Sequence, residues 1–419
     1  MQNTPESSYD LIVVGAGAAG MMAAITAARQ GNKVLLLEKL SKIGAKLKAT
    51  GGGRCNLTNT LSNEDFMARF GRDGRFMTPA LEALDHKALI AFFAEIGVQS
   101  HAPDGYRVFP VSHSAVSIIT ALEEEMARLG VILITSARVE CLEHDGTRVT
   151  GVSTAKQSYN APNVIIATGG LGYPQLGAEG DGFTLASAVG HKVTALFPAM
   201  MPLRTKETWV AACRADTIPK AELRVNLAKA KNLRAKGDLI FTANGIRGPV
   251  VLDFAREVNP LLAKYGEVPL LINMTKGLNE EHLRAHIKNE IHKHPEQSVL
   301  THMMTLLPES LCRELCILAG ADPDTGFNKL DGIARDRLIK LLAWTPLTVV
   351  GHDGFKMAMI TRGGISLKEI RPESMESKIL KGLYFCGEVM NLDGPCGGYN
   401  LQWSFSSGYL AGRLGKLPA

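Results

Sequence analysis

The sequence lacks a strong excess of either positive or negative charge. Its 46 lysine and arginine residues exceed its 41 aspartate and glutamate residues by five, and so mild an excess does not by itself indicate a nucleic-acid-binding protein. Internal repeats and low-complexity tracts are also missing from the 419 residues, so nothing points to a solenoid or a disordered chain. With 46% hydrophobic and 21% charged residues, the composition is that of an ordinary globular enzyme.

Cysteines are few and long apolar runs are nearly absent. The seven cysteines are odd in number, scattered and without a secretory signal, so we expect reduced thiols in a cytoplasmic protein. One stretch, 12–28, is apolar enough to suggest a signal peptide or a membrane span. Glu6 and Asp10 precede it where a signal needs lysine or arginine, and its glycines fit a turn better than a lipid-facing helix. We therefore expect no membrane anchor there.

The same stretch fits a dinucleotide-binding βαβ unit. Apolar Leu11–Val14 runs into Gly15-Ala16-Gly17-Ala18-Ala19-Gly20, and Glu38 follows a second apolar run, 33–37. The three glycines permit, in order, a tight turn, close approach of the backbone to a diphosphate, and packing of the helix on the sheet. We expect the diphosphate at the helix N-terminus and the Glu38 carboxylate at the hydroxyls of the adenosine ribose.

The length allows two or three domains. Helical spacing over 78–98 and 112–129, a strand over 131–135 and a hairpin over 139–153 continue the nucleotide-binding part. Residues 201–277 have the character of β-structure and 279–343 that of helices. We predict an α/β fold in which an insertion splits the nucleotide-binding domain. The boundaries are 1–200 and 363–419 for the two parts of that domain, 201–278 for the first part of a β-rich domain, 279–343 for a helical insert and 344–362 for the return through the β-rich domain.

The rest of the chain favours FAD over NAD(P) as the bound dinucleotide. The buried strand 163–167 runs into Thr168-Gly169-Gly170, where small residues let a flat cofactor pass close to the backbone. Near the C-terminus, Gly387-Glu388, Asp393 and Gly397-Gly398-Tyr399-Asn400 supply a strand end, an acid and a second helix N-terminus. Such a segment suits the ribitol and ring of a flavin, whose N1–C2=O edge becomes anionic on reduction. A nicotinamide dehydrogenase has no need of it.

Further motifs follow one another in chain order. Together with the first glycine turn they resemble the bacterial flavoproteins called the aminoacetone oxidase family, or BaiN/RdsA-like NAD(P)/FAD-dependent oxidoreductases, over essentially the whole chain. The resemblance implies a glutathione-reductase-like FAD-binding Rossmann domain, split by an inserted β-barrel-like domain and a small helical domain, with NAD(P)H as transient reductant. The motifs are Lys39 with Lys42–Lys46, Thr50–Asn59 with its Gly-Gly-Gly-Arg-Cys-Asn core, Tyr106–Pro110, Thr361–Gly364, Tyr384–Glu388 and Gly397–Trp403.

The expected FAD contacts come from widely separated segments of the chain. They combine the first βαβ unit, the glycine loop that follows it, the middle strands and the C-terminal turn. The predicted contacts are Gly15, Gly17, Ala18, Ala19, Gly20, Glu38, Lys39, Lys46, Gly51, Gly52, Gly53, Arg54, Cys55, Asn56, Val139, Ala167, Thr168, Gly169, Gly387, Glu388, Asp393, Gly398, Tyr399, Asn400 and Leu401.

The family implies several substrates: a uridine in large-subunit ribosomal RNA, aminoacetone, and bile acids. We expect uridine reduction to dihydrouridine, because nine basic residues against three acids lie between 201 and 236 and suit a polyanion. A solvated surface accounts for such a stretch equally well, and only Trp209 interrupts it with an aromatic ring. The alternatives are a flavin oxidase or reductase of a small molecule, such as an aminoacetone-type amine or a bile-acid-type enone, and a non-catalytic ribosome-associated flavin-binding factor.

Reducing the C5=C6 bond of uridine takes a hydride at C6 and a proton at C5, so an acid must lie beside the flavin. Cys55 is the first candidate, and its neighbour Arg54 can hold an anion or the ring carbonyls. Cys396 is the second, and Tyr399 can stack on the substrate or donate to it. Packing alone is an equally good interpretation of Cys55 and also fits Tyr399.

No metal site is expected. Cys312 and Cys316 have helical spacing that suits a core better than a redox pair. The histidines of the helical insert lack the carboxylate spacing typical of a metal site and fit a solvated helix face; they are His286, His292, His294 and His302.

Overall fold

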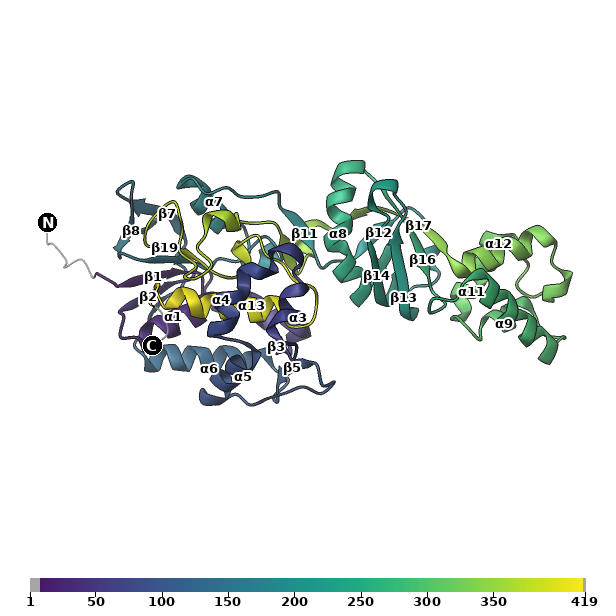
Figure 1. The fold of residues 1–419 in the computed structure, drawn as a ribbon, viewed down its shortest axis with the longest axis horizontal. Coiled ribbons are helices and arrows are strands. Elements are labelled where there is room, and N and C mark those ends of the chain that lie inside the picture. Colours follow the sequence, from purple (N-terminus) through teal and green to yellow (C-terminus); the bar gives the residue numbers. More distant parts are fainter. Residues whose placement is uncertain (1–7, 417–419) are drawn as a thin grey trace. The chain divides into compact units, whose positions relative to one another are not determined.

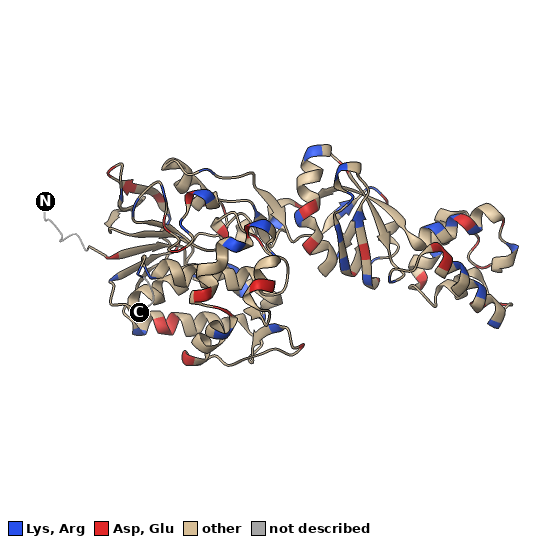
Figure 2. Cartoon of the chain, in the orientation of Figure 1, with Lys and Arg blue, Asp and Glu red and all other residues tan. Residues whose placement is uncertain are grey.

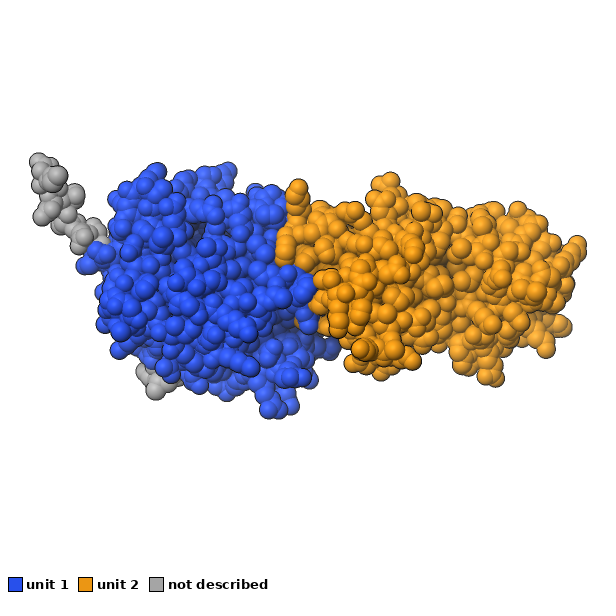
Figure 3. Space-filling model, turned by 90° about the horizontal axis from the view of Figure 1, so that it is seen from above, with its two compact units in different colours: residues 1–197, 359–419 blue, residues 198–358 orange. Residues whose placement is uncertain are grey.

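The computed structural model describes residues 8–416 and divides the chain into two compact units. Figure 3 colours them: one comprises the residues up to 197 together with those from 359 onwards, and the other comprises 198–358. Each unit has its own hydrophobic core. The insertion thus forms a unit of its own, and the finer boundaries within it stay predictions.

A five-stranded parallel sheet forms the centre of the first unit, with the strand order β19-β10-β1-β2-β6 (Figure 1). Most of its strands are short, buried runs of valine, leucine and isoleucine, as a sheet covered on both faces requires. Helix α1 leads from β1 to β2 and packs against α6 and α13, while the antiparallel β7-β8-β9 sheet contacts β10. The predicted βαβ unit is confirmed.

The bounds of the first unit's elements are β1 Leu11–Val14, α1 Ala18–Arg29, β2 Val34–Leu37, α2 Ala45–Ala49, β3 Thr58–Asn59, α3 Asn63–Ala68, α4 Thr78–Ala83, α5 His86–Glu95, β4 Ser100–His101, β5 Arg107–Pro110, α6 Ala115–Arg128, β6 Ile132–Ile134, β7 Val139–His144, β8 Val149–Thr154, β9 Ser158–Asn160, β10 Val164–Ile166, α7 Asp181–Ala188, β18 Ile360–Arg362, β19 Leu383–Phe385 and α13 Tyr399–Gly412. The predicted hairpin over 139–153 is the pair β7 and β8. The helical spacing over 78–98 belongs to two helices, because Leu84 and Asp85 leave the helical conformation between α4 and α5.

Small residues let α13 lie directly on α1. A Cβ atom on Gly408 would stand 2.3 Å from the carbonyl oxygen of Ala19, and one on Gly412 would stand 2.4 Å from that of Ala23. The C-terminal helix is therefore held against the first turns of α1, which brings residues 18–29 and 399–412 together.

Replacing Gly408 by valine is expected to lower the free energy of unfolding by about 2–3 kcal/mol, because the helices must separate to admit the side chain. Urea denaturation of the purified protein measures this. Gly332→Ala is the control, since nothing lies within 4 Å of a Cβ there, and we expect a change below about 1 kcal/mol. Equal stability of both variants would show that α13 is not closely packed on α1.

The second unit contains a closed six-stranded barrel, β12-β15-β14-β13-β16-β17, with a helical segment between β16 and β17 (Figure 1). Its bounds are β12 Leu203–Thr205, β13 Thr217–Val225, β14 Arg234–Thr242, β15 Gly245–Arg247, α8 Pro249–Tyr265, β16 Val268–Asn273, α9 Glu280–Lys293, α10 Val299–Met303, α11 Glu309–Ala319, α12 Gly332–Ala343 and β17 Thr345–His352; β11 is Phe197–Ala199.

One expectation for this unit is wrong. The stretch 201–277 is not uniformly β-rich, because Pro249–Tyr265 forms the long helix α8. The pair Gly248-Pro249, which suggests a turn, starts this helix, since proline is well suited to the first helical position. Helix α8 then buries Val251, Phe254 and Val258 against the barrel.

Candidate active site

The turn between β1 and α1 leaves an open space in front of a helix N-terminus. Gly17, the N-cap of α1, has extended backbone angles, no side chain caps the helix, and nothing lies within 4 Å of a Cβ placed on Gly17. In contrast, a Cβ on Gly20 would stand 1.9 Å from the carbonyl oxygen of Gly15. The first and third glycines thus serve packing, while the second faces a space where free N–H groups and the helix dipole favour an anion.

The Glu38 carboxylate is fixed beside this turn. Its Oε2 accepts a hydrogen bond from the Ala16 N–H at 2.8 Å, and its Oε1 accepts one from the Leu40 N–H at 2.8 Å. Each oxygen keeps a lone pair for a further donor. The carboxylate is therefore oriented to accept hydrogen bonds from the two hydroxyls of a ribose.

The loop after β10 lies against the same turn. A Cβ on Gly15 would stand 2.8 Å from the carbonyl oxygen of Ala167 and 3.1 Å from the Cα of Thr168. The Thr168 hydroxyl is buried and has no hydrogen-bond partner. A Cβ on Gly182 of α7 would stand 2.2 Å from this oxygen, so the hydroxyl is packed against that helix.

A partly buried ion pair joins the glycine-rich loop region to the segment that follows the C-terminal strand β19. Lys46 Nζ lies 2.6 Å from Glu388 Oε2, and the other carboxylate oxygen of Glu388 accepts a hydrogen bond from the Thr361 N–H at 2.9 Å. A side chain on Gly170 would crowd this pair, because its Cβ would stand 2.4 Å from Thr361 Oγ1 and 2.8 Å from Glu388 Oε1. Four segments that are far apart in the sequence thus meet at Glu388.

The loop 50–59 also holds the N-terminus of α13. The Asn59 side-chain amide donates a hydrogen bond to the Gly397 carbonyl at 2.9 Å. With the Asn56 side-chain amide in its favoured orientation, its oxygen accepts a hydrogen bond from the Gly398 N–H at 3.0 Å. Asn400 pins the preceding turn by exchanging hydrogen bonds with the backbone of Gly394. The predicted contacts Asn56, Gly398 and Asn400 are thereby brought together.

Two tyrosine hydroxyls meet at this loop. Tyr399 Oη lies 2.5 Å from Tyr106 Oη, and the Tyr399 ring packs on Phe66 and Phe70. Tyr399 is buried, whereas Tyr106 is partly exposed. Tyr106 was not among the predicted site residues, although it lies in a motif that carries the family resemblance; only the fold shows that its hydroxyl reaches Tyr399.

The environment of Cys55 does not suit the general acid expected there. Its thiol is fully buried, and burial raises its pKa to about 12 despite a hydrogen bond with Thr50. Such a thiol holds its proton too firmly to donate it readily at neutral pH. Arg54 is exposed, with its guanidinium 5.2 Å from the centre of the Phe109 ring, and Cys396 is partly exposed in the turn before α13.

The other predicted contacts lie around these groups. Gly51, Gly52 and Gly53 all have positive φ angles, so the loop needs glycine. Lys39 pairs with Glu179 and Asp181, at 2.8 and 2.6 Å, which leaves its ammonium already neutralised. Gly387 follows β19, and its Cβ would press on Ala19 of α1 at 2.9 Å. Val139 begins β7, Asp393 lies in the turn before α13, and Leu401 lies in its first turn.

Other kinds of site find no support in residues 8–416. No group of three histidine, cysteine, aspartate or glutamate side chains in this range is placed to hold a metal ion. Cys312 and Cys316 are buried in α11, as a core position requires, whereas His302 is buried rather than solvated, contrary to expectation. Within the same range, no helix has the length and apolar character needed to cross a membrane.

FAD fits the residues that are present. The open space at Gly17 and the oriented Glu38 carboxylate provide for a diphosphate and a ribose. The second helix N-terminus, at Gly398, has no side-chain cap and is held by Asn56 and Asn59 of the loop 50–59. It suits the anionic edge of a reduced flavin.

Comparison with known proteins agrees with this fit. A family model described as "HI0933-like protein Rossmann domain" matches residues 9–414. A 3-dehydro-bile acid delta(4,6)-reductase from Clostridium scindens is 31% identical over 96% of this chain and 97% of that protein. A ribosomal RNA dihydrouridine synthase from Haemophilus influenzae is also 31% identical, over 95% of this chain and 96% of its own, and one from Escherichia coli is 29% identical.

Solved structures show the same fold at low identity. A 3-ketosteroid delta1-dehydrogenase from Sterolibacterium denitrificans superposes with a TM-score of 0.52 at 12% identity, covering 97% of this chain and 99% of its own. A 3-ketosteroid-delta4-(5alpha)-dehydrogenase from Rhodococcus jostii gives a TM-score of 0.50 at 18% identity, covering 99% and 97%. At such identities these structures speak for the fold alone.

Proposed function

The chain belongs to the HI0933-like family of FAD-dependent oxidoreductases, and from that premise we propose that it uses NAD(P)H to reduce uridine to dihydrouridine in large-subunit ribosomal RNA. Two kinds of full-length relative support a reductase acting on a carbon–carbon double bond, since one is named a delta(4,6)-reductase and the other is named for forming dihydrouridine. They leave open whether the substrate is RNA or a small molecule.

The outer face of the barrel supports RNA. Arg224 on β13 and Arg234 on β14 stand directly opposite each other across the ladder, and the Arg224 guanidinium lies 3.8 Å from the centre of the Trp344 ring. Among the described residues, no carboxylate lies within salt-bridge distance of either arginine. Like charges facing each other across strands repel unless an anion lies between them. Figure 2 shows basic residues along both strands.

This cluster carries the choice of substrate. Two unneutralised guanidinium groups suit the phosphates of a nucleic acid. An aminoacetone-type amine is a cation and is repelled by such a face, and a bile acid offers the two arginines a single carboxylate where RNA offers a series of phosphates. Both arginines belong to the basic stretch 201–236, and the fold places them opposite each other on neighbouring strands.

The chain's own residues would divide the remaining work. FAD, when bound, supplies hydride transfer. The turn at Gly17, Glu38 and the N-terminus of α13 hold and orient it, and the Tyr106–Tyr399 pair holds a proton for uridine C5. A phenol gives up its proton more readily when a second hydroxyl donates a hydrogen bond to the phenolate.

Tyr399→Phe is expected to slow substrate reduction by about 100-fold with FAD retained, because a general acid contributes at least that factor. Cys55→Ala is the matched comparison, and its rate is expected to fall less than about 10-fold since its thiol does not donate. Single-turnover reduction kinetics, with the flavin absorbance as a check on loading, measure both rates. A larger loss for Cys55→Ala than for Tyr399→Phe would return the acid to Cys55.

A comparison of three substrates, each offered separately, tests the proposed function. Purified protein with FAD and NADPH or NADH is offered unmodified large-subunit ribosomal RNA, an unsaturated 3-oxo bile acid, or aminoacetone. We expect dihydrouridine in the RNA and little nicotinamide oxidation with the other two. Turnover of the bile acid alone would favour a small-molecule reductase, peroxide formed from aminoacetone without nicotinamide would favour an oxidase, and RNA binding without turnover would favour a non-catalytic ribosome-associated factor.

A further inference from the structure

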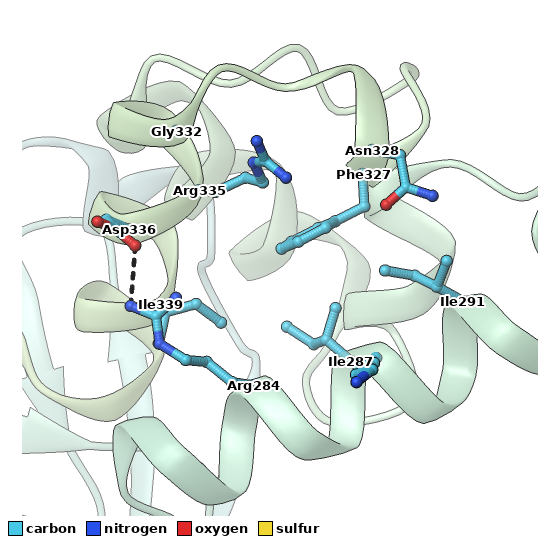
Figure 4. Close-up of a pocket in the computed structure, with 10 residues that line it drawn as sticks. Arg284, Ile287, Ile291, Phe327, Asn328, Gly332, Arg335, Asp336 and Ile339 are labelled. Carbon is cyan, nitrogen blue, oxygen red and sulfur yellow. Dashed lines mark hydrogen bonds and ion pairs between the residues drawn. The ribbon is translucent and has the colours of Figure 1, made fainter.

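A groove of about 460 Å³ lies between α9 and α12 in the second unit (Figure 4). Ile287 and Ile291 of α9 and Ile339 of α12 line it with apolar surface. The ring of Phe327, in the short turn between α11 and α12, points into the space between these helices. An apolar groove of this size with one aromatic ring can take a flat organic group such as a nucleobase.

Positive charge surrounds this apolar surface. Arg284 is neutralised by Asp336, with 2.9 Å between Nη2 and Oδ1. Lys288 and Arg335 also line the groove, and neither has a carboxylate within salt-bridge distance among the described residues. The helical segment as a whole is not basic, since ten acids face eight bases between 279 and 343. The two free cations are therefore a local feature of the groove.

The groove and the barrel's basic face are joined by one helix. Helix α12 carries Arg335 in its first turn, and Trp344, which stacks on Arg224, directly follows its last residue. At 1.5 Å per residue the two positions are about 13 Å apart along the helix axis. A short stretch of single-stranded nucleic acid can span that distance, so one strand can reach both places.

We propose that the groove holds an unpaired nucleotide of the RNA substrate, with its base against Phe327 and its phosphate between Arg335 and Lys288. The proposal rests on the proposed function, because it takes RNA as the partner of the second unit. It makes the α9–α12 groove a second RNA contact beyond the barrel face, and it adds a preference for a strand with an extrudable base over a regular duplex.

Binding to RNA tests the groove without any turnover. Anisotropy of a fluorescein-labelled oligouridylate is measured with the full-length, FAD-loaded protein and no nicotinamide. Phe327→Ala and Arg335→Glu are each expected to weaken binding by about 10-fold. Arg337→Glu is the control, since it makes the same charge change on the same helix at an exposed residue outside the groove, and it is expected to bind within about twofold of the original protein.

Two further probes keep the test decisive. Phe327→Leu keeps apolar bulk in case the alanine variant does not fold, and it should still lose affinity. An oligonucleotide of the same length without bases should bind the original protein and Phe327→Ala equally. If the groove variants bind RNA as Arg337→Glu does, or if the original protein binds the base-free strand as well as the oligouridylate, the groove proposal is wrong while the proposed function stands. If the original protein binds no RNA, both fail.

Discussion

Gly17→Val is expected to weaken FAD binding by at least about 100-fold and to leave the fold intact. Gly17 has φ −87° and ψ −171°, which valine adopts without strain, and no protein atom lies within 4 Å of its Cβ position. The added side chain would fill the space in front of the α1 N-terminus, where the diphosphate must approach the backbone closely. Titration of apoprotein with FAD, followed by flavin fluorescence, measures the loss.

Two other glycines show why this position is the informative one. Gly351→Val is the control, because it too points into open space, on β17 of the second unit, and it is expected to bind FAD normally. Gly20→Val would instead drive a side chain into the Gly15 carbonyl and damage the turn itself. Normal FAD affinity in Gly17→Val, with an unchanged melting temperature, would mean that the diphosphate lies elsewhere.

Reversing both charges of the barrel cluster, Arg224→Glu with Arg234→Glu, is expected to slow RNA reduction by about 100-fold while reduction of the flavin by NAD(P)H is unchanged. Two lost phosphate contacts should also reduce the slope of log affinity against log salt by about 1.4 for a single strand. Two facing glutamates repel each other much as the two arginines do, so the change in stability should be limited to the lost contact between Arg224 and Trp344.

A matched pair of substitutions separates this local effect from net charge. Lys264→Glu with Lys276→Glu makes the same change at two exposed lysines of the second unit, outside β13 and β14. We expect that variant to keep RNA reduction within a few-fold of the original rate. Equal losses in both double variants would show that the overall charge of the unit, and not the arginine cluster, governs RNA binding.

The sequence allows the nucleotide-binding half to be predicted because its signals are local. A strand, a glycine turn and an acid at fixed spacing describe Leu11–Glu38 whatever lies around them, and Gly398 marks a second helix N-terminus in the same way. The contact between the loop 50–59 and the turn before α13 cannot be read from a local pattern. It depends on the side chains of Asn56, Asn59 and Asn400, which hydrogen-bond to the backbone of that turn. The family motifs contain these residues without showing what they bind.

The pKa of a side chain and its contacts with residues far along the chain depend on the tertiary structure, so they cannot be predicted from local sequence patterns. The burial that raises the pKa of Cys55 comes from the fold around its loop, so the sequence leaves catalysis and packing as equal interpretations of this thiol, and the structure favours packing. Tyr106 and Tyr399 are 293 positions apart in the sequence, and their hydroxyls meet in the folded chain. Helix α8 was missed because a Gly-Pro pair suits a turn and a helix start equally.

The dihydrouridine content of large-subunit ribosomal RNA, measured by mass spectrometry, tests the central claim most directly. The RNA is taken from cells lacking this protein and from the same cells carrying either the original chain or Gly17→Val. The account predicts a loss of dihydrouridine in the deficient cells, its return with the original chain, and no return with Gly17→Val. Identical dihydrouridine content in all three would contradict it.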